Sequence, residues 1–223
     1  MTERQHRARG QARRDALLRA AVEVAAERGA AGITHRAVTQ KAGVPLATAS
    51  YFFTSIDELA DEALRTFAAE SIAALNGLTT LLAEVNETPN GIAKLVSQAV
   101  APDLRVTLAQ MEAYLHSART PGALREAVAD TIDAFYGVAV AAARAAGSPQ
   151  PERIARTLVA VIDGLTLHHL AAPRDDWRLE VESAIRTLFL GHLVELGRAD
   201  EAERISAESD SAAAPAARSA ATE

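Results

Sequence analysis

The side chains with the clearest chemical pattern lie in residues 33–60, which read ITHRAVTQKAGVPLATASYFFTSIDELA. Thr34 can cap a short helix, because its hydroxyl accepts hydrogen bonds from free amides in the next turn. Gly43 follows where a turn needs a positive φ, and Pro45 opens a second short helix. Two short helices joined by a glycine turn predict a helix-turn-helix, whose second helix enters the major groove of DNA with its N-terminal half.

Catalytic and metal-binding chemistry has little support in the sequence. The chain has no cysteine, which excludes disulfides, thiolate metal sites and cysteine nucleophiles. The Glu-x-x-His pattern of di-iron bundles occurs once, at Glu3 and His6, while His168 and His169 are adjacent and so point in different directions. No nucleophile elbow, phosphate loop or dinucleotide fingerprint is present. We therefore predict a protein that is not an enzyme and that has no catalytic residue, cofactor or metal.

The rest of the sequence predicts an all-α protein of about nine helices. Alanine, the strongest helix former, is abundant, and no segment alternates apolar and polar residues for long. Prolines and glycines mark the breaks between helices. The expected helices span residues 11–28, 35–42, 45–53, 56–84, 89–100, 102–118, 121–147, 152–170 and 175–197.

The 223 residues divide by charge into unlike parts. Residues 1–55 hold nine Lys or Arg against four Asp or Glu, a net +5, whereas residues 56–223 hold 14 against 25, a net −11. A basic end on an acidic protein indicates that this end meets a polyanion, although a basic tail without a function would leave the same pattern. We expect a DNA-binding domain with a polar, arginine-rich arm over residues 1–55. A ligand-binding and dimerisation domain would follow over residues 56–199, and a polar, largely disordered tail over residues 200–223.

The N-terminal segment resembles the DNA-binding part of the tetracycline-repressor (TetR) family of bacterial transcription regulators. The resemblance covers residues 12–62 and rests on a helix ending in Ala-Glu-Arg-Gly, then Gly-Ile-Thr, Ala-Gly-Val and Tyr-Phe-Phe-x-Ser-x-Asp-Glu-Leu. The matching positions include Gly43, Val44, Thr48, Phe53, Ser55, Glu58 and Leu59. The chain departs from the family pattern at Thr39, Ala47, Ser50, Phe52 and Ile56. Ile56 replaces a lysine that usually contacts a phosphate, so backbone contacts should depend more on other residues.

The resemblance implies a set of DNA contacts on the two short helices. Thr34 and His35 would touch phosphates, Arg36 would donate to a guanine edge, and Tyr51 would give its hydroxyl to a phosphate. The expected set is Thr34, His35, Arg36, Leu46, Ala47, Thr48, Ser50, Tyr51 and Phe52. Packing against the first helix is the alternative role for Tyr51 and Phe52, and a solvated surface position is the alternative for Arg36.

A helix-turn-helix of this kind reads two half-sites, so the chain needs a self-complementary surface. Apolar residues cover the last two long helices, and Gly164 and Gly191 would allow close approach of helices there. The resemblance implies a four-helix bundle with a second copy. Its expected residues are Leu158, Ile162, Leu165, Ile185, Leu188, Phe189, His192 and Leu196. The alternative is that these residues are buried within one chain.

By the same resemblance, the middle helices should enclose a pocket for an effector. The candidate lining residues are Phe67, Leu108, Met111, Glu112, Leu115, Phe135, Tyr136 and His168, each of which could also be ordinary core. Few charges lie on these faces, so we expect an apolar or amphipathic small molecule.

We therefore expect a ligand-responsive transcription regulator, by family habit a repressor, that binds palindromic operator DNA as a homodimer and is released by its effector. Its partners would be double-stranded DNA, a second copy of the chain and an unidentified small molecule. No stretch approaches the roughly 18 uninterrupted apolar residues of a membrane span, and the N-terminus is not a secretory signal, so we expect a cytoplasmic location without membrane contact. The alternative is a helical scaffold that binds a protein partner, with a helix-turn-helix that is only structural.

Overall fold

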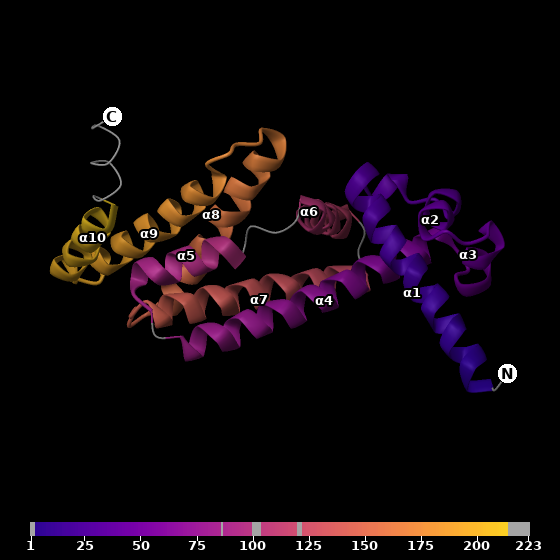
Figure 1. Ribbon diagram of the computed structural model, residues 1–223, viewed down its shortest axis with the longest axis horizontal. Helices are drawn as coiled ribbons and strands as arrows, with labels where there is room; N and C mark the ends of the chain where they lie inside the picture. The colour runs from indigo at the N-terminus through magenta and orange to yellow at the C-terminus, as the bar shows by residue number, and fades with distance from the viewer. Residues whose placement is uncertain (1–2, 86, 100–103, 120–121, 214–223) are drawn as a thin grey trace, which may run out of the picture. The chain divides into compact units, whose positions relative to one another are not determined.

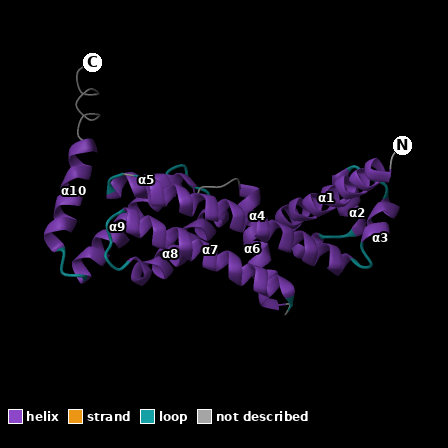
Figure 2. Ribbon diagram, turned by 90° about the horizontal axis from the view of Figure 1, so that it is seen from below, coloured by secondary structure: helices purple, strands orange, loops and turns teal. Residues whose placement is uncertain are grey.

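The computed structural model of the chain consists of helices joined by loops (Figures 1 and 2). It describes residues 3–85, 87–99, 104–119 and 122–213, and no strand occurs among them. The all-α prediction is confirmed, with ten α-helices in the described residues where about nine were expected. They are α1 (Glu3–Arg28), α2 (His35–Ala42), α3 (Leu46–Phe52), α4 (Ile56–Glu84), α5 (Pro89–Ala99), α6 (Leu104–Arg119), α7 (Ala123–Ala145), α8 (Pro151–Ala171), α9 (Trp177–Glu195) and α10 (Ala199–Ala213), with a short 3-10 helix, η1 (Ala30–Gly32), after α1.

By packing, the chain divides into two compact units. The N-terminal unit comprises Met1–Ala74 and Pro102–Ala134, and the C-terminal unit comprises Leu75–Ala101 and Phe135–Glu223. The boundaries fall inside α4 and α7, so each of these helices contributes residues to both units. The boundaries between the two packing units therefore differ from the boundaries of the functional domains that the sequence suggests.

The core of the N-terminal unit gathers around α1. Leu17 and Val24 of this helix are at most 1% exposed, and Val38, Leu59 and Leu64 from α2 and α4 are fully buried in the same cluster. Helix α6 packs along α1, and two residues of α7 complete the cluster. The short helices α2 and α3 are therefore held by a core that includes helices from the middle of the chain.

The core of the C-terminal unit is centred on α9. Val181 and Leu193 of this helix are fully buried, and they join Ile92 of α5 and Ile154 of α8 in one apolar cluster. Helices α5, α8 and α10 each pack against α9. The last two long helices thus contribute their main apolar stripes to the core of a single chain.

A buried polar contact fastens the turn between α7 and α8 to α9. The Oγ of Ser148 and the Nε2 of His192 lie 2.8 Å apart, and both side chains are buried. The same hydroxyl oxygen accepts the backbone N–H of Gln150 at 3.2 Å. Burial lowers the pKa of His192 below its ordinary value of 6.5, and the nearby charge of Arg153 lowers the pKa further. The site therefore accommodates the neutral imidazole.

Helix α1 begins at Glu3 rather than near Gln11, so the arginine-rich segment expected as an arm is helical where the structure describes it. The segment RARGQARR consists mostly of strong helix formers, and only Gly10 opposes the helix. These turns contain no apolar stripe, so no periodic pattern in the sequence reveals them.

Residues 200–213, expected within a largely disordered tail, form most of α10. Ala202 and Ile205 are each 6% exposed and join the core of the C-terminal unit. The side-chain amide of Asn90 also donates to the carbonyl of Ile205 at 3.3 Å. Ala202 and Ile205 attach this helix to the core, and two apolar residues are too few to produce a periodic pattern in the sequence. Residues 214–223 of the expected tail lie outside the described residues.

We expect the substitution Ile205→Ala to destabilise the protein by roughly 2 kcal/mol, because it removes buried methyl groups and leaves a cavity under α10. The melting temperature measured by calorimetry should fall by about 5 °C for a chain of this length. Arg204→Ala on the exposed side of the same helix is the matched control and should change little. An Ile205→Ala variant with the melting temperature of the unaltered protein would contradict the packing of α10 against the core.

Candidate nucleic-acid interface and ligand groove

Helices α2 and α3 form the helix-turn-helix, with the turn geometry that the sequence predicts. The Thr34 hydroxyl accepts the N–H of Ala37 at 3.1 Å and so caps α2. Gly43 ends α2 with a φ of 67°, and the N–H of Val44 reaches back to the carbonyl of Thr39 at 3.0 Å. Any other residue at position 43 would be strained by this φ. The turn therefore sets the angle between the two helices.

Buried side chains anchor the motif from below. Val38 and Ala49 are fully buried and Phe53 is 2% exposed, while Ala42 and Val44 pack at the edge of the same cluster. These five residues form the small core of the motif. The anchoring leaves the other side of α3 free of packing constraints.

Thr39, where the TetR pattern has a small alanine, is also buried. Its hydroxyl donates to the carbonyl of His35 at 2.7 Å, one turn earlier in α2. The extra polar atom is thus satisfied inside the helix that carries it. The departure from the family pattern leaves the fold of the motif intact.

Helix α3 presents an open edge. Tyr51 is 82% exposed and Leu46 is 56% exposed, although an isolated chain gains nothing from leaving such side chains in water. Ala47 and Ser50 are exposed as well, and Thr48 is half-buried. Of the two aromatic rings, Phe52 packs against the core cluster and meets Tyr51 edge-on, with 4.9 Å between ring centroids. The packing role therefore applies to Phe52, whereas Tyr51 stays available.

The start of α2 adds two exposed polar residues to this edge, Thr34 and Arg36. His35 between them is half-buried, and its Nε2 is buried without a hydrogen-bond partner in the described part of the chain. The phosphate contact expected of His35 thus cannot use Nε2 in this conformation.

Side chains on both sides of its first residue cap the start of α4. Ser55 Oγ accepts the N–H of Glu58 at 3.1 Å, and the Glu58 carboxylate accepts the N–H and the hydroxyl of Thr54, both at 2.6 Å. The hydrogen bond from the Thr54 hydroxyl is the main reason why the pKa of Glu58 lies below its ordinary value. Ile56, which stands in place of a phosphate-binding lysine, packs against the core cluster. That position therefore serves the packing of the motif.

Arg14 ties α1 to the helix-turn-helix and to α4. Its guanidinium lies 2.5 Å from a carboxylate oxygen of Glu62 and 5.2 Å from the centre of the Phe53 ring. Phe53 is the residue that ends α3. One side chain thus joins three helices of the N-terminal unit around the C-terminal end of α3.

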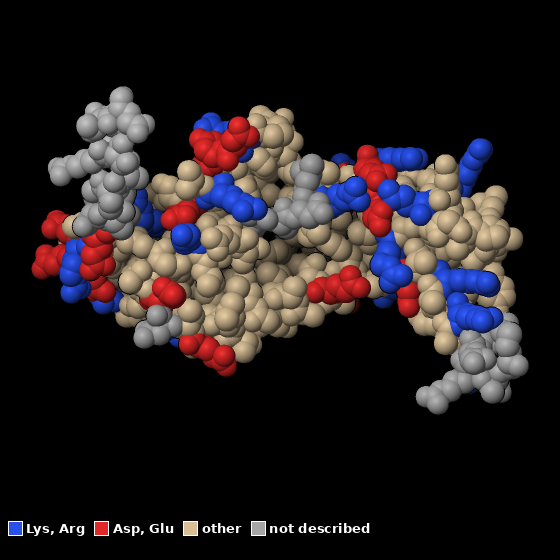
Figure 3. All heavy atoms as spheres, in the orientation of Figure 1, with Lys and Arg blue, Asp and Glu red and all other residues tan. Residues whose placement is uncertain are grey.

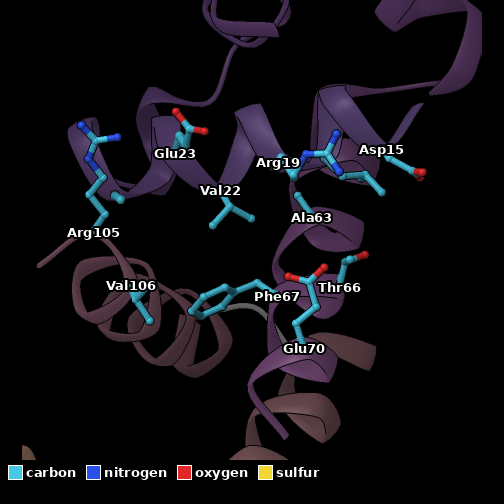
Figure 4. Close-up of a pocket in the computed structure, with 12 residues that line it drawn as sticks. Asp15, Arg19, Val22, Glu23, Ala63, Thr66, Phe67, Glu70, Arg105 and Val106 are labelled. Carbon is cyan, nitrogen blue, oxygen red and sulfur yellow. The ribbon is translucent and has the colours of Figure 1, made fainter. Parts of the chain in front are cut away.

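A groove of about 480 Å³ lies in the N-terminal unit (Figure 4). Val22, Phe67 and Val106 supply apolar surface from α1, α4 and α6, and Figure 4 shows the Phe67 ring and the Glu70 carboxylate directed into the space between these helices. The remaining lining residues are Asp15, Leu18, Arg19, Glu23, Ala26, Ala63, Thr66 and Arg105. The groove has the volume and mixed surface typical of small-molecule sites.

Phe67 is the one expected effector contact that lines this groove. Leu108 and Met111 are half-buried and Leu115 is 49% exposed on α6, while Glu112 accepts the N–H of Ala30 at 3.0 Å. Glu112 therefore has a structural role beside η1. The other three belong to the C-terminal unit, where Phe135 is half-buried, Tyr136 lies 4.8 Å beneath the Arg156 guanidinium and His168 is exposed. A pocket formed by all eight residues stays a prediction.

Asp163 of α8 is a candidate that the sequence analysis missed. Burial raises the pKa of this carboxyl to about 6, and no basic group contributes to the shift. The available signal was a single acid inside the apolar run of residues 158–167. The described residues contain no group of three or more His, Asp or Glu that could hold a metal ion. A half-buried carboxyl with a raised pKa is a candidate for a functional site.

The residues expected to form a dimer interface turn toward the core of the C-terminal unit. Leu158, Ile185, Phe189 and His192 are at most 7% exposed in the single chain. Ile162, Leu165 and Leu188 are partly buried against the same cluster, and Leu196 is half-buried. A chain buries the most apolar stripe of a helix in its own core first, and this applies to the four buried residues. An interface role for the four partly buried residues stays a prediction.

The outer faces of α8 and α9 carry a sparser set of apolar and small residues. Leu167 and Leu179 are 54% and 67% exposed, and Val194 is 53% exposed. Gly164 and Gly191 lie three residues before Leu167 and Val194, respectively, and a Cβ added at either glycine would meet no atom within 4 Å. Helix α8 is long and apolar enough to cross a membrane by length and composition, and only 22% of its most apolar window is buried. An apolar surface of this kind indicates a partner helix.

Two family profiles match the chain. The profile described as "Bacterial regulatory proteins, tetR family" matches residues 17–63, and the one described as "Tetracyclin repressor-like, C-terminal domain" matches residues 83–191. None of the curated proteins compared is significantly similar to the chain.

Several solved structures of transcription regulators are similar to the chain. A regulator from Streptomyces coelicolor A3(2), SCO7518, is 29% identical, with 79% of this chain and 98% of that chain covered and a TM-score of 0.57. A regulator from Rhodococcus sp. Rha1, RHA1_ro04179, is 25% identical, with 82% and 96% covered and a TM-score of 0.66. The multidrug binding protein EbrR, in complex with proflavin, is 28% identical, with 79% and 99% covered and a TM-score of 0.56. EbrR is also known in complex with ethidium.

We expect Tyr51→Ala to leave thermal stability unchanged, because this side chain is almost entirely in solvent. Its affinity for specific duplex DNA should fall about tenfold, the effect of losing one specific contact. Phe52→Ala is the matched variant and should lower the melting temperature, since its ring packs against the core. Fluorescence anisotropy and calorimetry measure the two effects. Equal losses of stability in both variants would contradict the open edge of α3.

Proposed function

Because the chain belongs to the TetR family of bacterial transcription regulators, whose members are not enzymes, we propose that it represses transcription as a homodimer on palindromic operator DNA and responds to a small molecule. The observation that carries this proposal is the open edge of α3. Exposed Leu46 and Tyr51 stand on a short helix that is fixed from the opposite side by Ala49 and Phe53. A cytoplasmic location follows from this function.

Each exposed residue of the motif has a suitable partner on DNA. The Thr34 hydroxyl accepts from Ala37 and keeps its own proton to donate to a phosphate. Arg36 can donate two hydrogen bonds to a guanine edge, and Tyr51 can donate its hydroxyl to a phosphate. Thr48 and Ser50 can reach a base or a phosphate, and Leu46 and Ala47 suit thymine methyl groups.

A second copy of the chain would cover the outer faces of α8 and α9. The exposed side chains of Leu167, Leu179 and Val194 supply the apolar contact, and Gly164 and Gly191 allow helix backbones to approach closely. Such an arrangement sets the separation of two recognition helices, which must match one turn of DNA, about 34–36 Å.

The effector we propose is an amphipathic organic cation. The relative EbrR is complexed with proflavin and ethidium, which are planar aromatic cations. In this chain, burial raises the pKa of Asp163, and no basic group contributes to that shift. Phe135 and Tyr136 are half-buried aromatic residues of the same unit. A planar cation would gain charge pairing with this carboxylate, and stacking on an aromatic side chain would add to its affinity.

Release from DNA would follow from a shift between two populations of the protein. Helix α4 contributes to both compact units and starts directly after the helix-turn-helix, so a change in its position moves α3. A coupling free energy of about 1–3 kcal/mol is typical, and nearly complete release needs about 5 kcal/mol. A protein-binding scaffold, which is the alternative, would select no consensus from a pool of duplexes.

The DNA-binding proposal is tested by selecting duplexes from a random pool with the full chain. The selected sites should be palindromic, with half-site centres about one helical turn apart. Gly164→Arg should convert the dimer to a monomer in light scattering and weaken binding to the selected site more than tenfold, since two half-sites can no longer be held together. Gly77→Arg on the exposed side of α4 is the matched control. Selection of no consensus would exclude the proposed function.

The effector proposal predicts that ethidium binding weakens as the pH falls through about 6, because protonation removes the charge of Asp163. Asp163→Asn should lower the affinity for ethidium roughly tenfold at pH 7.5 and abolish this pH dependence. Asp133→Asn, at an exposed position of α7, is the matched control. Isothermal titration of the DNA-free protein gives both quantities. A pH-independent affinity in the unaltered protein would rule out Asp163 as the counter-charge.

A further inference from the structure

The described side chains in the first turns of α1 are not part of the protein core. From Arg7 onward, where the structure describes the side chains, the first buried residue of the helix is Leu17, and the side chains of Arg7, Ala8, Arg9, Gln11, Ala12 and Arg13 are exposed. We call residues 3–13 the α1 extension, which spans about three helical turns and roughly 16 Å at 1.5 Å per residue.

The positive charge of the DNA-reading segment is concentrated in this extension and the residues next to it. Residues 1–14 hold five Arg and one Glu, a net +4. Residues 17–63, the segment that matches the tetR profile, hold four Lys or Arg against six Asp or Glu, a net −2. Without the extension, the reading segment would carry an excess of the same charge as DNA.

Two cations close to the helix-turn-helix form ion pairs within the protein. Lys41 lies 2.5 Å from a carboxylate oxygen of Glu27 and 3.3 Å from one of Glu23. Arg14 pairs with Glu62. Helix α3 itself contains no charged residue. The open edge described above therefore offers Arg36 but little further charge for the phosphates of a duplex.

We propose that the α1 extension is a second DNA-binding element, which lies against the phosphates that flank the half-site read by α3. This inference rests on the proposed function. In both ribbon views the N-terminal end of α1 lies at the same end of the N-terminal unit as α3, and Lys and Arg side chains gather along α1 in Figure 3. Neutralising phosphates with arginine releases counterions, which supplies most of the affinity for DNA of any sequence.

The helical form of the extension fixes the spacing of its arginines. Arg9 and Arg13 are one turn apart on one face, and Arg7 lies on another face. Gly10 stands between them, and a Cβ added there would meet no atom within 4 Å. Position 10 can therefore be changed to strengthen or break the helix without disturbing a contact.

The test compares salt dependence on a 40-base-pair duplex of random sequence. For the variant in which Arg7, Arg9 and Arg13 are all changed to Gln, the slope of log K against log salt should fall by about 0.9 per phosphate contact, up to about 2.7 in total. Affinity should fall at least about tenfold at 0.15 M salt. The control changes Arg144, Arg153 and Arg204 of the C-terminal unit to Gln, which alters the net charge equally. An unchanged slope in the first variant overturns the proposal.

Two further variants test the helix. Gly10→Ala should retain or steepen the slope, whereas Gly10→Pro should reduce it although every arginine remains. A Gly10→Pro variant with the slope of the unaltered protein would overturn the helical part of the proposal.

The outcomes separate this inference from the proposed function. If duplex selection yields a consensus and the triple variant keeps the full salt slope, the extension has no DNA role and the function stands. If the triple variant instead loses binding to vesicles of anionic phosphatidylglycerol without a change on DNA, the extension serves a membrane surface and the proposal is wrong. If selection yields no consensus, the proposed function fails first.

Discussion

The position of α3 depends on the left-handed backbone conformation of Gly43 and on two buried side chains, those of Ala49 and Phe53. Seven residues are too few for a stable isolated helix, so the shape of α3 is imposed by the turn at Gly43 and by the packing of Ala49 and Phe53. Because the anchors lie on one side, the opposite side can carry any side chain without loss of stability. This separation lets the exposed residues of α3 differ from the TetR pattern while the fold of the motif persists.

Ion pairs in the N-terminal unit mainly connect helices. Arg14 and Glu62 join α1 to α4, and Lys41 joins α2 to the end of α1 through Glu27. These pairs are partly exposed, so each contributes little to the free energy of unfolding. Their main effect is on orientation, because they hold the helices that surround α3 in one arrangement.

The sequence predicted the helix-turn-helix in detail because its signals are local. The cap at Thr34 and the turn at Gly43 each depend on atoms within a few residues of one another, and the structure contains both. The start of α1 and the helix α10 escaped prediction because exposed or weakly anchored helices show no apolar period. The sequence also could not show that Ile185 and Phe189 pack into the core of their own chain. Periodicity identifies an apolar face of a helix, but it does not identify the residues that cover that face. The raised pKa of Asp163 likewise depends on burial by residues distant in the chain.

Glu112 connects two segments that the family profiles treat separately. Its carboxylate on α6 accepts the N–H of Ala30 in the turn that leads from α1 to α2, at 3.0 Å. A hydrogen bond lengthened by half an ångström is largely lost, so a sliding motion of α6 must either pull this turn along or free a backbone amide. The chain thus has a mechanical link from its middle helices to the front of α2, in parallel with the covalent one through α4.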